Sequence, residues 1–195
     1  MSEYLKFQIT DSGPVSREII KRGFFEFYAF AEYIRSLPYG RTSDPMDILT
    51  VLNENQGTCS GKHQLLATVA HECGRYKIKL MIGIYKMSEE NTPGVGPILS
   101  QASVESIPEA HCYLSVNGSR FDFTGLKTGV SAPFDSLLSE HVILPFELAE
   151  SKPRIHKRTI KAWAERHKLN FSQAWALREE CIKALIANNQ IQPTS

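Results

Sequence analysis

The sequence lacks the features that mark secreted, disulfide-linked or membrane-spanning chains. Its 195 residues include four cysteines, which are widely spread and form no Cys-x-x-Cys pair. Residues 1–22 hold no apolar run of signal-peptide length, and nothing approaches the roughly 18 consecutive apolar residues of a membrane span. We therefore expect a cytoplasmic protein with free thiols and no membrane partner, long enough to bury its core without disulfides.

A strong net charge is also missing, although the charges are unevenly distributed. The chain carries +1 in total; from Lys152 onward nine basic residues face three acidic ones, a balance of +6, which leaves −5 for residues 1–151. The basic tail, with two helices and a polar turn, faintly resembles a helix-turn-helix. We interpret it instead as a solvated helical face whose apolar residues, such as Trp163 and Trp175, pack on the body. Nucleic-acid binding is therefore not expected, and the oligomeric state stays open.

Hydrophobic periodicity predicts an α+β chain. We expect one domain over residues 1–150 and a helical extension over residues 151–195 that packs on it. Little periodicity is found over residues 88–108, which indicates either a lid or binding loop or a disordered segment. The predicted helices cover residues 15–37 with Ser16 as N-cap, a short stretch from Asp44-Pro45, 59–73, 157–167 and 172–188. The predicted strands cover residues 77–87, 110–116, 120–124 and 141–144.

Cys59 begins a predicted helix, directly after the turn Gln56-Gly57-Thr58. A helix N-terminus carries partial positive charge and unpaired N–H groups. That setting favours the thiolate, which is the nucleophilic form of cysteine, and suits an oxyanion. Taken alone, Cys59 is more often a small buried residue that fills space.

A hairpin around Asn117-Gly118 brings two further polar groups to one face. With a two-residue turn, Leu114 pairs with Phe121. His111 and Asp122 then share the face of the hairpin opposite to those apolar side chains, at diagonal positions within side-chain reach. A three-residue turn would place Asp122 on the other face. Cys59, His111 and Asp122 thus supply, in that order, a nucleophile, a base and a group that orients the base.

These residues resemble the motifs of the transglutaminase-like superfamily, over about residues 56–125. Gly57-Thr58-Cys59 is similar to the Gly-x-Cys that opens its active-site helix, His111-Cys112-Tyr113 to its His and aromatic pair, and Asp122-Phe123-Thr124 to its Asp-Pro-Thr element. Ser60, Tyr113 and Phe123 stand where tryptophan, tryptophan and proline are frequent in the family.

The resemblance implies a papain-like core, in which an antiparallel sheet packs on the nucleophile helix, and thiol acyl chemistry without a cofactor. The substrate is expected to be a peptide or a small amide. We assign the oxyanion donors and the pocket wall to Gln56, Thr58 and Tyr113, together with the Cys59 backbone N–H. The acyl acceptor, water or an amine, is left open, and the family also contains catalytically silent members that act as binding modules.

Two rival interpretations use neighbouring residues. His63 lies four residues after Cys59 on the same side of the helix and is a secondary candidate for the base. Lys62 can add positive potential, but we interpret it as a solvated surface lysine. A zinc site built from cysteine and histidine is disfavoured, because His71 and Cys73 point in different directions and Cys112 faces away from His111. We therefore expect no metal.

Overall fold

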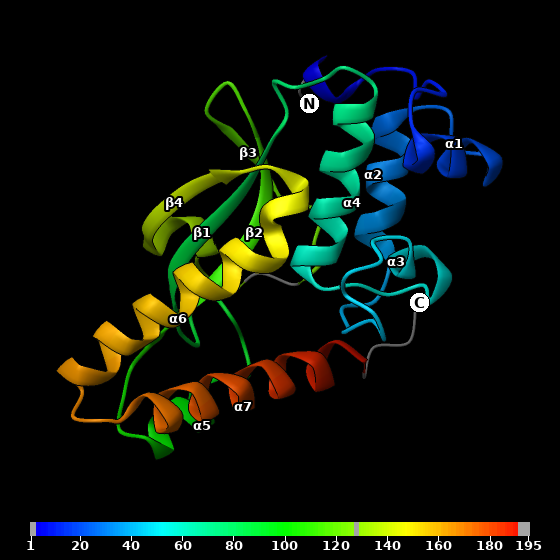
Figure 1. Ribbon diagram of the computed structural model, residues 1–195. Coiled ribbons are helices and arrows are strands. Elements are labelled where there is room, and N and C mark those ends of the chain that lie inside the picture. The colour runs from blue at the N-terminus through cyan, green and yellow to red at the C-terminus, as the bar shows by residue number, and fades with distance from the viewer. Residues whose placement is uncertain (1–2, 127–128, 191–195) are drawn as a thin grey trace. The chain divides into compact units, whose positions relative to one another are not determined.

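Seven α-helices and a four-stranded antiparallel sheet form the described part of the computed structural model, residues 3–126 and 129–190 (Figure 1). The chain is therefore α+β, as its periodicity predicts. The α-helices are α1 (Pro14–Lys21), α2 (Phe27–Ser36), α3 (Thr50–Asn53), α4 (Cys59–Glu72), α5 (Gly96–Gln101), α6 (Leu148–Arg166) and α7 (Phe171–Gln190). The strands are β1 (Lys79–Met87), β2 (Ile107–Val116), β3 (Ser119–Phe121) and β4 (Leu137–Ile143), and the 3₁₀ helices are η1 (Glu3–Leu5), η2 (Pro133–Ser136) and η3 (Pro145–Glu147).

The sheet has the strand order β3-β2-β1-β4. Strands β2 and β3 form the predicted hairpin, in which Leu114 pairs with Phe121 and Val116 with Ser119. The turn residues Asn117 and Gly118 have φ values of 48° and 82°. Positive φ at both positions is what a two-residue hairpin turn requires, so Asn-Gly fixes the register here.

Residue contacts divide the chain into two units. Unit 1 comprises Met1–Met81, Cys112–Gly125 and Val142–Ala149; unit 2 comprises Ile82–His111, Leu126–His141 and Glu150–Ser195. The predicted boundary between residues 150 and 151 falls inside α6 and stays a prediction. In the ranges that the structure describes, no helix is both long and apolar enough to cross a bilayer.

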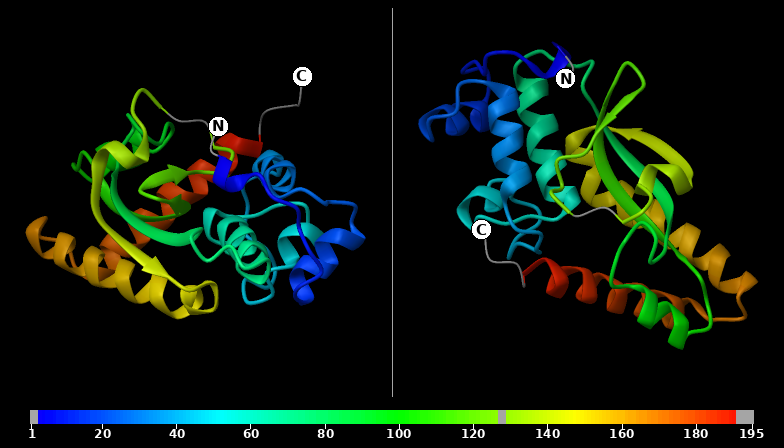
Figure 2. Two further views of the ribbon diagram at one scale, coloured as in Figure 1. Left: turned by 90° about the horizontal axis from the view of Figure 1, so that it is seen from above. Right: turned by 180° about the vertical axis from the view of Figure 1, so that it is seen from behind.

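Helix α4 is the centre of unit 1. It contacts α1, α2, α3 and η3, and Figures 1 and 2 show it alongside α2. Its apolar residues Leu65, Leu66 and Val69 are fully buried. At its last turn the Glu72 carboxylate accepts the N–H groups of Val15 and Ser16, and so satisfies donors at the start of α1. The C-terminal end of the helix that carries Cys59 is therefore tied to the start of α1.

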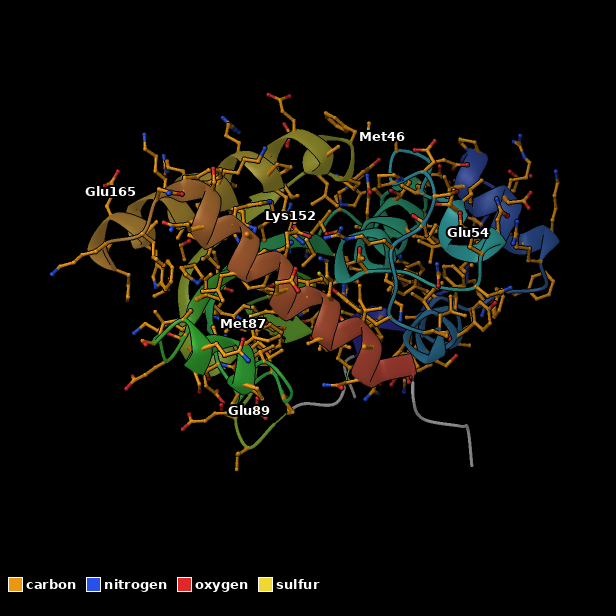
Figure 3. The ribbon with its side chains drawn as sticks, turned by 90° about the horizontal axis from the view of Figure 1, so that it is seen from below. Met46, Glu54, Met87, Glu89, Lys152 and Glu165 are labelled. Carbon is orange, nitrogen blue, oxygen red and sulfur yellow. The ribbon has the colours of Figure 1, made fainter. Side chains whose placement is uncertain are left out.

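In unit 2, α5 contacts α7, and both figures show the two helices alongside each other. The segment before α5 is ordered by Glu89, labelled in Figure 3, whose carboxylate accepts the N–H groups of Gly94 and Gly96. The side chain of Leu99 in α5 is buried. The disordered alternative for residues 88–108 is therefore wrong, because this stretch holds a helix and the first residues of β2. Its role as a lid or binding loop stays a prediction.

The predicted helix over residues 15–37 is two helices in the structure. Gly23 has a φ of 88°, and the N–H of Phe24 donates to the carbonyl of Ile19. This left-handed residue with a six-to-one hydrogen bond is a Schellman ending for α1. The N-cap is Gly13, not Ser16; the Ser16 hydroxyl instead accepts the Gly13 N–H.

Smaller differences concern boundaries and exposure. No helix begins at Asp44, whose carboxylate accepts the Met46 N–H in a turn; helix α3 begins only at Thr50. Strand β1 is buried on both faces over most of its length. The predicted strand over residues 141–144 is β4, which begins four residues earlier than predicted, and α6 begins nine residues earlier.

Candidate active site

Cys59 is the first residue of α4, as predicted. Thr58 is extended and caps the helix, and its hydroxyl accepts the Gly61 N–H at 3.4 Å. The Cys59 side chain is almost fully buried, with 5% of its surface exposed. It therefore lies at the positively polarised end of a 14-residue helix. Such a position favours a thiolate over a thiol.

Gly57 packs closely beneath this first turn. A Cβ atom at residue 57 would come within 3.0 Å of Lys62 Cγ and 3.2 Å of Val51 Cγ1. The backbone on either side of the turn is held by the segment that follows α2, because the Gly57 N–H donates to the Pro38 carbonyl and the Gly57 carbonyl accepts the Gly40 N–H. The small residue before Thr58 thus has a steric cause.

Lys62 is fully buried, which contradicts its interpretation as a solvated surface lysine. Its ammonium donates to the carbonyl of Leu37 at 2.5 Å and to that of Thr124 at 2.7 Å. Burial lowers the pKa of Lys62 to about 8, against the opposing effect of the Asp122 and Cys59 charges, which raise it. No feature of the local sequence indicated this residue except its place one turn after Cys59.

His63 is also fully buried, and hydrogen bonds engage both of its ring nitrogens. Nδ1 lies 2.8 Å from the Cys59 carbonyl and Nε2 lies 2.8 Å from the Phe123 N–H. Because a carbonyl only accepts and an N–H only donates, this pattern describes a neutral ring with its proton on Nδ1. Proton exchange with the Cys59 thiol would require one of these bonds to break. The geometry gives His63 the role of joining α4 to the segment after β3.

Asp122 follows the last residue of β3. Its Oδ1 accepts the Thr124 N–H at 2.8 Å and lies 3.6 Å from His63 Nε2. The side chain is 28% exposed. The β2–β3 ladder ends at the pair Leu114–Phe121, so Asp122 lies one residue beyond its last pair. Unit 1 therefore gathers Cys59, Lys62, His63 and Asp122 around the first turn of α4.

His111 lies on β2 and belongs to unit 2, whereas Cys59 and Asp122 belong to unit 1. His111 is 8% exposed, and its aromatic neighbours include Tyr85 at 6.2 Å and Phe134 at 6.1 Å between ring centroids. The placement of this ring opposite the Cys59 sulfur stays a prediction.

The predicted pocket residues differ in their surroundings. The Gln56 amide donates to the Arg41 carbonyl at 2.8 Å, and the Thr58 hydroxyl is used in the helix cap. Tyr113 is fully buried within β2. Their assignment to an oxyanion hole or a pocket wall stays a prediction.

The thiols of Cys112 and Cys181 are both fully buried. Burial raises the pKa of the Cys181 thiol to about 11, which makes it a poor nucleophile near neutral pH. Cys112 is fully buried, with its sulfur 3.7 Å from the Ser60 hydroxyl. Within residues 3–126 and 129–190, no three histidine, cysteine or acidic residues gather in a group that fits a metal ion.

Comparison with known proteins finds no match for this chain. A scan against protein-family models finds no match, and searches of curated proteins and of solved structures find no similar chain. The resemblance to the transglutaminase-like superfamily therefore depends on the short motifs around Cys59, His111 and Asp122.

Proposed function

We propose that this chain is a transglutaminase-like cysteine acyltransferase or amide hydrolase with a papain-like core. Cys59 is the nucleophile, His111 the base and Asp122 the group that orients the base. The observation that carries the proposal is the setting of Cys59: a buried sulfur at the N-terminus of α4, with the Lys62 ammonium one turn away. Helix end and cation both favour the thiolate.

One contact within unit 1 supports the triad. The His63 ring bonds the Phe123 N–H, next to Asp122, and so holds the Asp122 turn against α4. The confirmed hairpin register further supports the shared face that the triad requires.

In the proposed reaction, the Cys59 thiolate attacks the acyl carbon of a carboxamide, and a C–S bond forms as the carbonyl becomes an oxyanion. The tetrahedral intermediate collapses, the C–N bond breaks, and the His111 imidazolium gives its proton to the departing amine. Water or a second amine then attacks the thioester, with His111 accepting its proton. The Cys59 thiolate leaves, and the product is an acid or a new amide.

The test measures alkylation of each cysteine by iodoacetamide at pH 7, followed by mass spectrometry of peptides. Cys59 should react at least about tenfold faster than the partly exposed Cys73. The His111→Ala variant should slow Cys59 alone, while His141→Ala, a histidine on β4, serves as the matched control. Equal and slow labelling of all four thiols would refute the enzyme. Amine-transfer assays on glutamine peptides then separate transfer from hydrolysis.

A catalytically silent binding module is the second candidate, and a groove in unit 1 favours it. The groove has a volume of about 540 Å³ and a mostly apolar lining that includes Ile48, Leu49, Pro145 and Phe146. Met46, labelled in Figure 3, also lines it and is 71% exposed. Apolar grooves of this kind are common at binding sites. Slow Cys59 labelling would leave this candidate as the better one.

A further inference from the structure

Lys62 is a buried cation that is held by backbone carbonyls. It has no exposed surface, and its ammonium donates to Leu37 O and Thr124 O. Among the residues that the structure describes, no carboxylate forms an ion pair with it. Burying an ammonium is costly unless it is paired or fully hydrogen-bonded. A neutral side chain of similar length would fill this space at lower cost, so the charge needs another explanation.

The position of Lys62 relates it directly to Cys59. The two residues are three apart on α4, so they lie on neighbouring positions of one helix face. Helical side chains lean toward the helix N-terminus, which directs the Lys62 stem back toward the first turn. The ammonium adds a full positive charge to the partial charge of the helix end.

Lys62 also joins two segments around the site. Leu37 caps the C-terminal end of α2, and Thr124 belongs to the turn that carries Asp122. These segments approach closely, since a Cβ atom at Gly125 would lie 2.0 Å from the Arg35 carbonyl oxygen. One ammonium therefore fixes the end of α2 and the Asp122 turn on α4.

We propose that Lys62 is a positioning residue for this site: its ammonium stabilises the Cys59 thiolate and holds the turn of Asp122. This inference deepens the proposed function and rests on it. Lys62 itself does not touch the reacting carbon; it acts through the sulfur and through the turn.

The charges around Lys62 support a mutual interaction. The groups facing it are Cys59 on α4, Asp122 on the turn after β3, and His63, whose hydrogen bonds describe a neutral ring. Negative charge on Cys59 or Asp122 raises the pKa of Lys62, which burial lowers to about 8. Because electrostatic attraction acts equally on both partners, the ammonium stabilises the thiolate to the same extent. Above about pH 8 this support is lost as Lys62 releases its proton.

The first experiment compares pH profiles of Cys59 alkylation in wild type, Lys62→Met and Lys62→Arg. Lys62→Met should slow labelling at pH 7 about tenfold and move the rise of the profile to higher pH, because the thiolate loses its cation. Lys62→Arg should retain most of the rate. Lys79→Met, which removes an exposed lysine from β1, is the matched control and should leave the profile unchanged. An unshifted Lys62→Met profile would overturn the proposal.

A second measurement needs no change at Lys62 and covers the case in which Lys62→Met fails to fold. The titration of Lys62 is followed by NMR of its side chain in wild type and in Cys59→Ser. Loss of the thiolate should move the Lys62 midpoint to lower pH; an identical midpoint would refute the interaction. The two proposals fail differently. Slow Cys59 labelling in wild type rejects the proposed enzyme function. Fast labelling that is unchanged in Lys62→Met rejects only the positioning role of Lys62.

Discussion

Arg178 in unit 2 and Lys62 in unit 1 are two basic side chains that are largely shielded from solvent, and their partners differ. In unit 2, Arg178 of α7 makes a two-pronged ion pair with Glu109 of β2, with distances of 2.6 and 2.7 Å. In unit 1, the Lys62 ammonium donates to two carbonyl oxygens, and no carboxylate in residues 3–126 and 129–190 forms an ion pair with it. The first cation has a full opposite charge in contact, and the second does not.

The pKa values follow this difference. Burial alone would lower the pKa of Arg178, but Glu109 outweighs it and raises the pKa above the usual value. Burial likewise would raise the pKa of Glu109, yet the charges of His156 and Arg178 keep it low. For Lys62 burial dominates, and its pKa falls to about 8. The pair in unit 2 is therefore a permanent structural link, whereas the cation beside Cys59 can lose its charge under mild conditions.

Breaking the unit 2 pair should give the largest loss of stability. Arg178→Met leaves the buried Glu109 carboxylate uncompensated, and we expect a loss of about 3–5 kcal/mol in the free energy of unfolding. Denaturant titration followed by circular dichroism measures it. Arg154→Met, which removes an exposed arginine from α6, is the control and should change stability by less than about 0.5 kcal/mol.

The double variant Arg178→Met with Glu109→Gln separates two causes of the lost stability: the lost ion pair and the uncompensated charge left on Glu109. It should recover much of the stability lost in Arg178→Met, because no buried charge remains. A single variant within about 1 kcal/mol of wild type would show that the pair is not the link described here.

Alkaline pH should reveal the opposite behaviour of Lys62. Its pKa is about 8 when folded and 10.5 when unfolded, so between these values the unfolded chain binds more protons. Stability therefore rises with pH between these two values. The contribution of Lys62 is fully present above pH 10.5, where the side chain is neutral in both states, and is lost as the pH falls through 8 and the buried amine must take up a proton. Relative to Lys62→Met, wild type should gain roughly 3 kcal/mol across this window. Unfolding by guanidinium at several pH values, in the Cys59→Ser background, measures the difference, and a constant difference would contradict the assigned burial.

The contrast between Lys62 and its surroundings also shows what the sequence can predict. The start of α4 was predicted correctly because the turn Gln56-Gly57-Thr58 precedes Cys59 and the apolar residues after Cys59 follow the helical period. The hairpin register was predicted because Asn117 and Gly118 tolerate positive φ. In both cases the determining residues are local.

The burial of Lys62 has no local signal. Its partners Leu37 and Thr124 lie 25 and 62 residues away, so the carbonyls that accept from it are brought together only by the packed fold. The same holds for Arg178 and Glu109, which are separated by 69 residues. The break between α1 and α2 is different, because Gly23 is a local signal for the end of a helix. The apolar period on both sides of Gly23 nevertheless favoured one long helix. Pro153 is a local signal against a helix interior, yet α6 continues through it. The start of α6 at Leu148 was therefore not predicted.

The smallest expected effect distinguishes the helix end from the cation as the source of thiolate stability. Thr58→Ala removes the cap of α4 and should lower the free energy of unfolding by about 1 kcal/mol. Labelling of Cys59 at pH 7 should fall only about two- to threefold, because a frayed first turn weakens the partial charge of the helix end while Lys62 keeps its full charge. Thr58→Ser retains the hydroxyl and should match wild type in both measurements. If Thr58→Ala instead slowed labelling as much as Lys62→Met, the helix end would be the dominant source of thiolate stabilisation. The difference between the permanent charge of Arg178 and the removable charge of Lys62 would then have no consequence for the reactivity of Cys59.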